Sequence, residues 1–503
     1  MSPFLVIILV LLAVYKLYRF TIDKPPNSPP GIIRLPIGGS YWMLLWKNYK
    51  FPHLAVDYYT KKLKSKIISG YFGDFFLVIV NDYASIKEVF TREEFDGRVT
   101  CLETINDRAF GKKLGIFFID GPQWHEQRRF ALRYMRDFGF GRRQDKLESE
   151  IMDEMSLFID ILKNGPIYDG EKEIMKGNLM LFPDILYATS ANNIWNVMFG
   201  QRFDRSKHDI SRHLCRSAMM FQRANETTGG MILFLPILKY FGNMFGYTNH
   251  MKGNYAIVDV VKKTLEEQKI TLSEHIDRGF VDKYLKKLNE NDKSEYFTEE
   301  QLIILLVDVM FPALSASPTV ITHIIKYLMH HPKAMEKAQS EIDTIVGTGR
   351  LVTWEDRKDL PYIEAVIRET MRIETLTPFG VIHKALKDTT LGGYDIPANT
   401  PIFTNLSAMH HDREMWGDPE NFRPERFLKE DGQICKDMSL PFGLGHRVCM
   451  GETYARYTIF ETLALLLQNF NFSFVEGEPS SLEDRVPGLI VNVKELWIRL
   501  ELR

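Results

Sequence analysis

One cysteine in a glycine-rich segment is the residue best placed to do chemistry in this chain. Cys449 lies in residues 441–451, which read Pro-Phe-Gly-Leu-Gly-His-Arg-Val-Cys-Met-Gly. Apolar residues recur at helical spacing through residues 455–470, so we predict a long helix that begins just after the cysteine. Unpaired backbone N–H groups and the helix dipole favour a thiolate at such a position. The segment therefore predicts an ionised sulfur that is available as a ligand.

The residues around Cys449 indicate what that sulfur could bind. Gly443, Gly445 and Gly451 allow backbone donors and a flat ligand to approach the sulfur, and Phe442 can shield one side from water. A buried thiolate that is surrounded by donors and open on one face meets the requirements of an axial ligand to haem iron. A reduced core cysteine beside a turn is the alternative for an isolated Gly-x-Cys-x-Gly.

The complete segment resembles the haem-thiolate loop of the cytochrome P-450 family. Phe442, Gly445, Cys449 and Gly451 stand in the spacing Phe-x-x-Gly-x-x-x-Cys-x-Gly. The other positions that agree with the family are Gly443, Arg447, Glu452 and Ala455. The resemblance implies that haem b is the cofactor, that Cys449 ligates its iron, and that the fold is mainly α-helical.

Trp124 and Arg128 are four residues apart, so they share one face of a helix that we expect to begin near Gln123. Taken alone, they form an ordinary cation–π pair. In the family, Trp-x-x-x-Arg donates hydrogen bonds to the haem propionates, and Arg447 and His383 match further propionate partners. Guanidinium and indole groups suit that role because both are strong N–H donors.

Three arginines on the same predicted helix form a basic stripe: Arg129, Arg133 and Arg136. A solvated helix face is an equally good interpretation of this pattern. The resemblance implies that an acidic electron donor docks there, namely NADPH-cytochrome reductase, with cytochrome b5 as a second candidate partner.

Glu369 and Arg372 are three residues apart and can pair on one helix face, as exposed residues often do. In the family this Glu-x-x-Arg pair is buried and joins an arginine from a later loop, here Arg426. We therefore expect the three residues to build the cysteine side of the haem pocket. The adjacent His410 and His411 could suggest a metal site. Neighbouring residues on a turn point apart, however, so we expect both histidines at the surface.

The chain departs from the family at residues 312–317, which read Pro-Ala-Leu-Ser-Ala-Ser. The family has Ala-Gly-x-Asp/Glu-Thr-Thr in this register, where the acid and the alcohol relay protons to iron-bound dioxygen. Ser315 replaces the acid and Ala316 replaces the alcohol, while Ser317 offers a hydroxyl one position later. We name Ser315 and Ser317 as the candidate catalytic residues. Pro312 and Pro318 should kink or widen this helix.

Composition sets broader limits on function. The chain has 503 residues, and its 63 Lys and Arg nearly balance its 65 Asp and Glu, so no nucleic-acid partner is indicated. The four cysteines show neither the density of a disulfide framework nor a Cys-x-x-Cys zinc spacing. A catalytic domain that faces the reducing cytosol fits best.

The N-terminal residues predict a membrane anchor. Residues 3–20 are apolar except for Lys16 and Arg19, and about 18 helical residues span roughly 27 Å, marginally enough for a bilayer. No basic segment precedes this run and no small-x-small cleavage site follows it. We expect an uncleaved anchor at residues 1–22, a stiff proline-rich hinge at 23–31, and a cytoplasmic catalytic domain at 32–503. The resemblance is to microsomal members, which implies the endoplasmic reticulum membrane.

Within the catalytic domain, residues 67–73 and 76–80 are expected to be short strands around a turn, and helical patterns dominate beyond them. The predicted class is mainly α with a minor β-sheet subdomain, in the cytochrome P-450 fold. Residues 219–247 are rich in Met, Phe, Leu and Gly. They form either ordinary core or an exposed apolar lip that contacts membrane lipid.

The sequence favours a membrane-bound monooxygenase that inserts one oxygen atom from O2 into a lipophilic small molecule. One alternative is a haem-thiolate isomerase or dehydratase that rearranges a lipid peroxide without a reductase, since the usual acid and alcohol are missing. Another is a non-catalytic haem sensor or lipid carrier. The positions that the resemblance places over the haem are mostly apolar and do not select among substrates. They are Phe311, Ala313, Thr377, Phe379, Val381 and Leu489.

Overall fold

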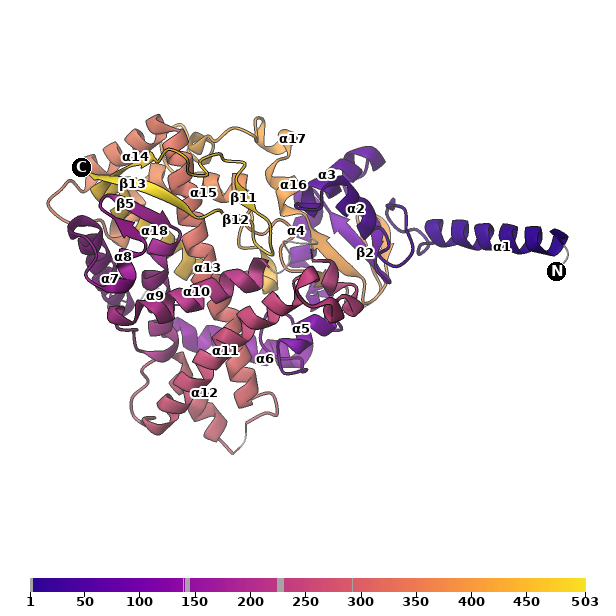
Figure 1. Ribbon diagram of the computed structural model, residues 1–503, viewed down its shortest axis with the longest axis horizontal. Coiled ribbons are helices and arrows are strands. Elements are labelled where there is room, and N and C mark those ends of the chain that lie inside the picture. The colour runs from indigo at the N-terminus through magenta and orange to yellow at the C-terminus, as the bar shows by residue number, and fades with distance from the viewer. Residues whose placement is uncertain (1–2, 139, 141–144, 224–229, 292) are drawn as a thin grey trace.

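A single long helix forms the centre of the molecule. The computed structural model describes residues 3–138, 140, 145–223, 230–291 and 293–503. Helix α13 (Glu299–His330) crosses the middle of the helical region, and most of its side chains are buried. The other long helices are α6 (Gly121–Arg136), α7 (Asp145–Asn164), α9 (Tyr187–Phe199), α10 (His208–Arg223), α11 (Tyr247–Ile270), α12 (Phe280–Asn289), α14 (Pro332–Ile345), α15 (Pro361–Glu374) and α18 (Glu452–Asn469). Helices α9, α10, α11, α14, α15 and α18 pack against α13, and the remaining long helices lie further out (Figure 1).

Shorter helices lie mostly at the periphery or in connections. The α-helices among them are α2 (Tyr41–Lys47), α3 (Pro52–Leu63), α4 (Tyr83–Thr91), α5 (Glu103–Asp107), α8 (Asp169–Lys172), α16 (Leu406–His410) and α17 (Arg413–Trp416). The 3-10 helices are η1 (Glu93–Phe95), η2 (Asp184–Leu186), η3 (Arg205–Lys207), η4 (Met231–Leu233), η5 (Pro236–Phe245), η6 (Trp354–Asp359), η7 (Pro424–Phe427) and η8 (Gly445–Arg447). The class is mainly α, as the sequence predicts.

The larger sheet lies between the helical region and the N-terminal helix (Figure 1). Its strand order is β1-β2-β9-β6-β3. The strands are β1 (Ile67–Phe72), β2 (Phe75–Val80), β3 (Gly97–Arg98), β6 (His383–Lys384) and β9 (Pro401–Thr404). Strands β1 and β2 form the predicted antiparallel pair, and at the opposite edge Arg98 is paired with His383. This edge of the sheet therefore brings together Arg98 and His383, which are far apart in the sequence.

A second sheet and two small hairpins complete the strands. The four-stranded sheet has the order β10-β13-β5-β4. The strands are β4 (Met175–Lys176), β5 (Leu179–Phe182), β10 (Phe470–Phe474) and β13 (Leu496–Leu502). The hairpins are β7 (Thr389–Leu391) with β8 (Tyr394–Ile396), and β11 (Arg485–Val486) with β12 (Asn492–Val493).

Helix α13 continues through both of its prolines. Pro312 and Pro318 lie inside one uninterrupted helix. Each proline removes one backbone donor, but the surrounding helices bury this stretch on most sides and hold it helical. The prolines therefore do not divide the helix.

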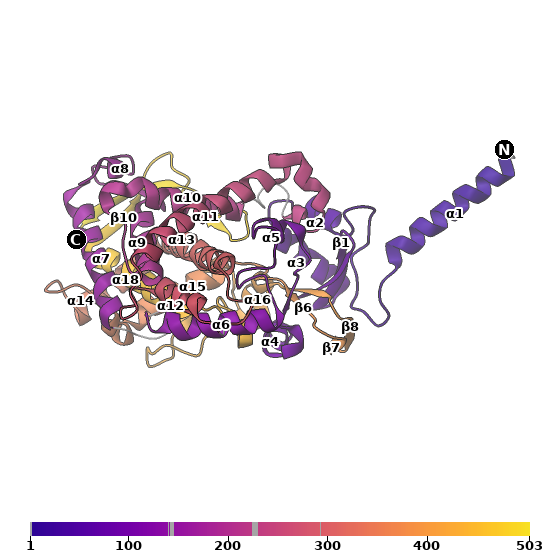
Figure 2. The ribbon, with the colours of Figure 1, turned by 90° about the horizontal axis from the view of Figure 1, so that it is seen from below.

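Helix α1 (Pro3–Ile22) projects away from the rest of the chain (Figures 1 and 2). Within the described residues, one helix is long and apolar enough to cross a membrane, and it is α13, whose most apolar window is 83% buried. That burial makes α13 a core helix. The membrane anchor at residues 1–22 stays a prediction.

The proline-rich segment that follows α1 is not a free spacer along its whole length. The backbone N–H of Asp395 donates to the carbonyl of Asn27 (3.1 Å), and the Ser69 hydroxyl donates to the carbonyl of Pro29 (2.8 Å). Gly31 forms a bridge with Ser69 in β1. Residues 27–31 therefore pack on the domain, because β1 of the larger sheet and β8 of a hairpin supply hydrogen-bond partners for their carbonyl groups.

The apolar segment between α10 and α11 is partly core and partly exposed. Phe234 is buried against the larger sheet, in contact with Phe72 and Phe403. In contrast, four large apolar side chains of η5 are strongly exposed: Ile237, Tyr240, Phe241 and Met244. The exposed part thus lies near the C-terminal end of residues 219–247.

Candidate functional site

Cys449 lies between η8 and the start of α18, in the position that the sequence predicts. Its backbone N–H donates to the carbonyl of Phe442 (2.9 Å), which closes the loop. Gly445 has φ +71°, and a Cβ at this position would lie 1.9 Å from the carbonyl oxygen of Phe90. Only glycine allows this approach, so the loop is fixed against α4.

The electrostatic environment of Cys449 differs from the predicted one. Burial raises the pKa of the Cys449 thiol above its ordinary value, although backbone N–H groups of Gly451 and Glu452 and the charge of Arg128 lower it. The end of α18 does not by itself ionise the sulfur, because desolvation outweighs the donors. The residue nevertheless retains exposed surface. A coordinated metal cation would deprotonate it.

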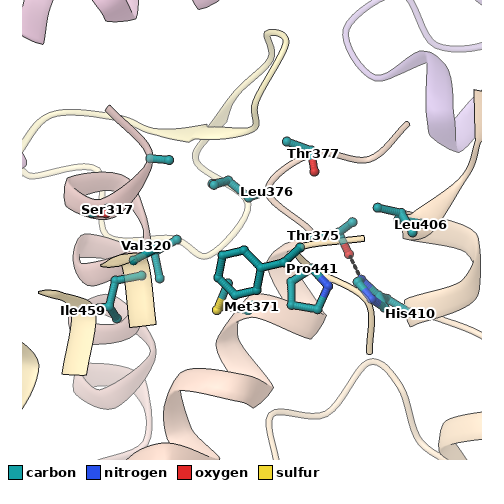
Figure 3. Close-up of a pocket in the computed structure, with 13 residues that line it drawn as sticks. Ser317, Val320, Met371, Thr375, Leu376, Thr377, Leu406, His410, Pro441 and Ile459 are labelled. Atoms are coloured by element: carbon teal, nitrogen blue, oxygen red, sulfur yellow. Dashed lines mark hydrogen bonds between the residues drawn. The ribbon is translucent and has the colours of Figure 1, made fainter. Parts of the chain in front are cut away.

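A pocket lies between α13 and α18, next to the segment that carries the cysteine (Figure 3). Ala316, Ser317 and Val320 line it from α13, and Ala455 and Ile459 line it from α18. The remaining wall comes from the end of α15, the segment after it, α16 and the turn before the cysteine: Met371, Thr375, Leu376, Thr377, Leu406, His410, Pro441 and Phe442. The lining is mostly apolar.

Three guanidinium groups gather beside this pocket with few counter-charges. Burial and the positive charges of Arg98 and Arg128 lower the pKa of Arg447 to about 8. Burial also lowers the pKa of Arg98 to about 10, and that of Arg128 is lowered for the same reason. Like charges held together in a buried place require an anion.

Two carboxylates lie near the cluster, Asp96 and Asp120, and their negative charges offset only part of its positive charge. An oxygen of Asp120 lies 2.9 Å from Nζ of Lys384, and an oxygen of Asp96 lies 2.8 Å from Nδ1 of His446. Arg447 instead donates to the backbone carbonyls of Asp96 and Ile119 (2.8 and 3.1 Å). A cofactor with two carboxylates, such as haem b, would supply the missing negative charge. The residues present therefore fit haem.

Trp124 and His383 complete the walls of the cationic cluster. The guanidinium carbon of Arg447 lies 3.5 Å from the centre of the buried Trp124 ring, and that of Arg128 lies at 5.7 Å. Nδ1 of buried His383 lies 2.8 Å from the carbonyl oxygen of Phe95. Burial lowers the pKa of His383 well below its ordinary value, so its ring is neutral. The structure thus brings the four predicted propionate partners together.

Arg98 is the member of this cluster that the sequence analysis missed. It lies in the two-residue strand β3, and no helical or strand pattern marks it. Its side chain is buried and donates to the carbonyls of Phe117 and Ile382 (3.1 and 3.3 Å). The sequence offered one weak indication of its role, a single arginine before an apolar valine. Only the pairing of β3 with β6 reveals which residues surround Arg98.

Glu369, Arg372 and Arg426 form the buried network that the resemblance predicts. Arg372 donates two hydrogen bonds to the Glu369 carboxylate (2.8 and 2.9 Å), and Arg426 donates a third (3.0 Å). Glu369 and Arg372 have no exposed surface. The interactions join α15 to the segment that precedes the cysteine loop, which supports a structural role.

The surface position expected for His410 is wrong. His410 is fully buried, and its Nδ1 lies 2.8 Å from the Thr375 hydroxyl in the pocket wall (Figure 3). His411 is exposed. The two histidines do point apart, as expected, but the turn that carries them is packed under α15, where Arg372 donates to the His410 carbonyl (2.7 Å). No group of metal-binding side chains occurs among the described residues.

The two candidate serines occupy different environments. The Ser315 hydroxyl donates to the carbonyl of Phe311 (2.6 Å) and accepts a hydrogen bond from Nε2 of Gln222 (2.6 Å), on α10. It is fully buried, and it does not line the pocket beside the cysteine loop. Ser317 and Ala316 do line that pocket. The structure therefore places only one of the two predicted hydroxyls at the candidate site.

Arg129, Arg133 and Arg136 are exposed on α6, while Trp124 on the same helix is buried. The stripe consequently faces away from Trp124 and the buried side of the helix. This arrangement is consistent with both a solvated helix face and a docking surface.

Comparisons with known proteins agree with this geometry. A family model described as Cytochrome P450 matches residues 29–498. The chain is 31% identical to a farnesoate epoxidase of Bombyx mori over 479 residues, which cover 94% of each chain. It is 32% identical to Cytochrome P450 2J3 of Rattus norvegicus over 92% of this chain and 89% of the relative. It is also 30% identical to Cytochrome P450 2F2 of Rattus norvegicus over 96% of each chain.

Proposed function

Because this chain belongs to the cytochrome P-450 family, we propose that it is a membrane-bound monooxygenase that inserts one oxygen atom from O2 into a hydrophobic hormone, sterol, terpenoid, fatty acid or xenobiotic. Members of the family are oxidoreductases that use haem b ligated by a cysteine thiolate. The observation that carries the proposal is the pocket between α13 and α18, with Cys449 and a cluster of guanidinium groups beside it.

In this proposal, Cys449 ligates the haem iron, and Arg98, Arg128 and Arg447 neutralise the propionates. Trp124 packs against the guanidinium groups of Arg447 and Arg128, neutral His383 lies beside the cluster, and Gly443 and Gly445 give the loop its shape, with φ +74° and +71°. Phe442 keeps water from the sulfur side of the ring. Bound haem supplies the activation of dioxygen. The chain supplies the dry pocket and the fixed positive charges.

Ser317 is the better candidate for a proton donor in the pocket. Its hydroxyl is on the pocket wall, whereas the Ser315 hydroxyl already has a donor and an acceptor partner. Ser315 is better suited to position Gln222 against α13. General acid–base groups typically contribute 10²–10⁴-fold, so the loss of the usual acid and alcohol should reduce the coupling of NADPH use to product formation.

The missing acid and alcohol in α13 favour a second candidate reaction, namely isomerase or dehydratase chemistry on a lipid peroxide. Ala316 lacks a hydroxyl, and Ser315 does not face the pocket. A peroxide that already contains the reacting oxygen atoms needs no external proton relay and no reductase. The exposed stripe of Arg129, Arg133 and Arg136 favours the reductase-dependent reaction, since NADPH-cytochrome reductase, or cytochrome b5, is proposed to dock there.

Turnover with and without reductase distinguishes these reactions. We expect product from lipophilic substrates only when NADPH and reductase are both present. A large part of the electrons from NADPH should form hydrogen peroxide instead of product. Ser317→Ala should lower coupling at least several-fold, because it removes the hydroxyl in the pocket. Ser473→Ala, on the strand β10, is the matched control. Turnover of a lipid hydroperoxide without NADPH would identify the isomerase reaction, and haem binding without any turnover would identify a sensor or carrier.

Membrane attachment is proposed to use α1 together with the exposed side chains of η5. Helix α1 projects from the domain, and Ile237, Tyr240, Phe241 and Met244 present apolar surface to solvent. The endoplasmic reticulum membrane is the proposed location, with the catalytic domain on the cytoplasmic side.

Deletion of residues 2–22 should convert the protein from an integral to a peripheral membrane protein. We expect the truncated protein to bind haem normally but to be released from membranes by high salt or mild detergent, as measured by sedimentation. Release should be more complete when Ile237 and Phe241 are also changed to Asp. Retention of the truncated protein in carbonate-washed membranes would show that α1 is not the anchor.

A further inference from the structure

A threonine at the end of α15 has a backbone conformation that β-branched residues rarely adopt. Thr375 has φ +40°, in the left-handed region. That conformation is costly for a residue with two heavy atoms on Cβ, and it persists only where the surroundings fix it. The backbone N–H of Thr375 donates to the carbonyl of Met371 (3.2 Å), so the residue ends the helix. Thr375 therefore turns the chain sharply out of α15.

The Thr375 side chain is bound to His410 on α16. The hydroxyl oxygen lies 2.8 Å from Nδ1 of His410 (Figure 3), and the hydroxyl donates to the carbonyl of Arg372 (2.8 Å). The other ring nitrogen of His410, Nε2, accepts the N–H of Leu440 (3.4 Å). Because Nε2 is an acceptor, Nδ1 carries the proton and donates to the threonine hydroxyl. The two side chains therefore fix each other's orientation.

The hydrogen bond between these side chains lies in the interior. Thr375 and His410 are both buried. Burial lowers the pKa of His410 to about 3, so the ring is neutral near pH 7. If the two groups separate, no bulk water replaces either partner, and a buried donor is left unpaired. Separation of the two side chains therefore costs free energy.

The two residues after Thr375 form part of the pocket beside the cysteine loop. Leu376 and Thr377 both line it (Figure 3). Helix α16 holds this segment at a second point, since the N–H of Ser407 donates to the carbonyl of Pro378 (3.3 Å). The positions of Leu376 and Thr377 in the pocket thus depend on the turn at Thr375 and on its contact with α16.

We propose that the hydrogen bond between His410 and Thr375 determines which ligands fit in this pocket, because it fixes the wall formed by Leu376 and Thr377. A ligand that is too bulky for the pocket must displace this wall, and the displacement breaks the bond. A small ligand leaves the wall in place. The two residues are therefore specificity-determining, although neither needs to contact the reacting atoms. The inference rests on the proposed function, since it concerns the ligands of the proposed haem pocket.

The test compares two iron-binding probes of different size, imidazole and 1-phenylimidazole, in the full-length, haem-loaded protein. Binding is measured from the shift of the Soret band. Thr375→Val keeps the shape of the side chain but removes the hydroxyl, and His410→Leu removes the other partner. We expect each variant to bind 1-phenylimidazole about tenfold more tightly than the native protein does, because no bond has to break; this is about 1.4 kcal/mol, or one net hydrogen bond. Imidazole should bind all three proteins equally within about twofold.

A double variant and two matched controls separate the bond from general effects. Thr375→Val combined with His410→Leu should again gain about tenfold and not about a hundredfold, because both changes remove the same interaction. Thr375→Ser retains the hydroxyl and should keep the native affinities within about twofold. Thr370→Val removes a buried hydroxyl of α15 that donates to the carbonyl of Val366 (2.9 Å), outside the pocket lining, and should also keep them.

Other outcomes would overturn the inference. Native affinity for 1-phenylimidazole in both single variants would show that the bond does not hold the wall. An additive gain in the double variant would show two independent effects. If His410→Leu does not load haem, the comparison of Thr375→Val with Thr375→Ser decides by itself, and equal affinities in these two would reject the bond. The reduced carbon monoxide spectrum tests the proposed function separately, because a thiolate-ligated haem can be present whether or not the bond affects the probes.

Discussion

Replacement of Cys449 by serine will abolish the red-shifted Soret band of the reduced carbon monoxide complex. That band depends on a thiolate bound to the iron opposite carbon monoxide, and a serine hydroxyl does not supply comparable electron donation. Turnover with NADPH and reductase should fall below detection. The effect should be complete, because Cys449 is the cysteine that the loop places between η8 and α18.

The matched control for this experiment is Cys435→Ser. Cys435 is half-buried, and it lies on the chain only fourteen residues before Cys449, so it tests whether any cysteine in this region affects the spectrum. The control should retain the native band and native turnover. A native spectrum in the Cys449→Ser protein would exclude Cys449 as the ligand. Loss of haem from both variants would indicate a general effect on folding instead.

Glu369→Gln should lower the free energy of unfolding by about 3–5 kcal/mol, since it leaves the buried guanidinium group of Arg372 without its carboxylate, while Arg426 keeps Asp418 (3.2 Å). Arg372 donates two hydrogen bonds to Glu369 and Arg426 donates one, and the pair Glu369–Arg372 is shielded from solvent. Glutamine keeps the shape of the side chain but removes its charge. We expect little haem-loaded protein at 37 °C and an early transition in urea, as followed by Soret absorbance.

An exposed ion pair provides the control for the Glu369 variant. Arg413 and Glu420 are 2.7 Å apart, and both side chains are more than half exposed. Glu420→Gln should change stability by less than about 1 kcal/mol, because solvent screens the pair. Equal urea midpoints for the Glu369→Gln and Glu420→Gln proteins would contradict a supporting role for the buried network.

The cysteine loop shows what the sequence by itself determined about this protein. The loop residues lie within ten positions of one another, so their spacing largely determines their relative positions in the structure. They are Phe442, Gly445, Cys449 and Gly451. Trp124 with Arg128, and Glu369 with Arg372, are likewise set by the helical repeat. The β1–β2 hairpin follows from a short turn between two apolar runs. Local geometry was sufficient in each case.

Tertiary structure decided the features that depend on contacts between distant segments. Arg98 joins the propionate cluster only because β3 pairs with β6, nearly three hundred residues later. The Ser315 hydroxyl is bonded to Gln222 on α10, and His410 is buried by its packing under α15. The pKa of Cys449 is raised because burial, which sequence spacing does not reveal, outweighs the local donors. Burial and long-range pairing are properties of the assembled fold, and the helical repeat carries no information about either.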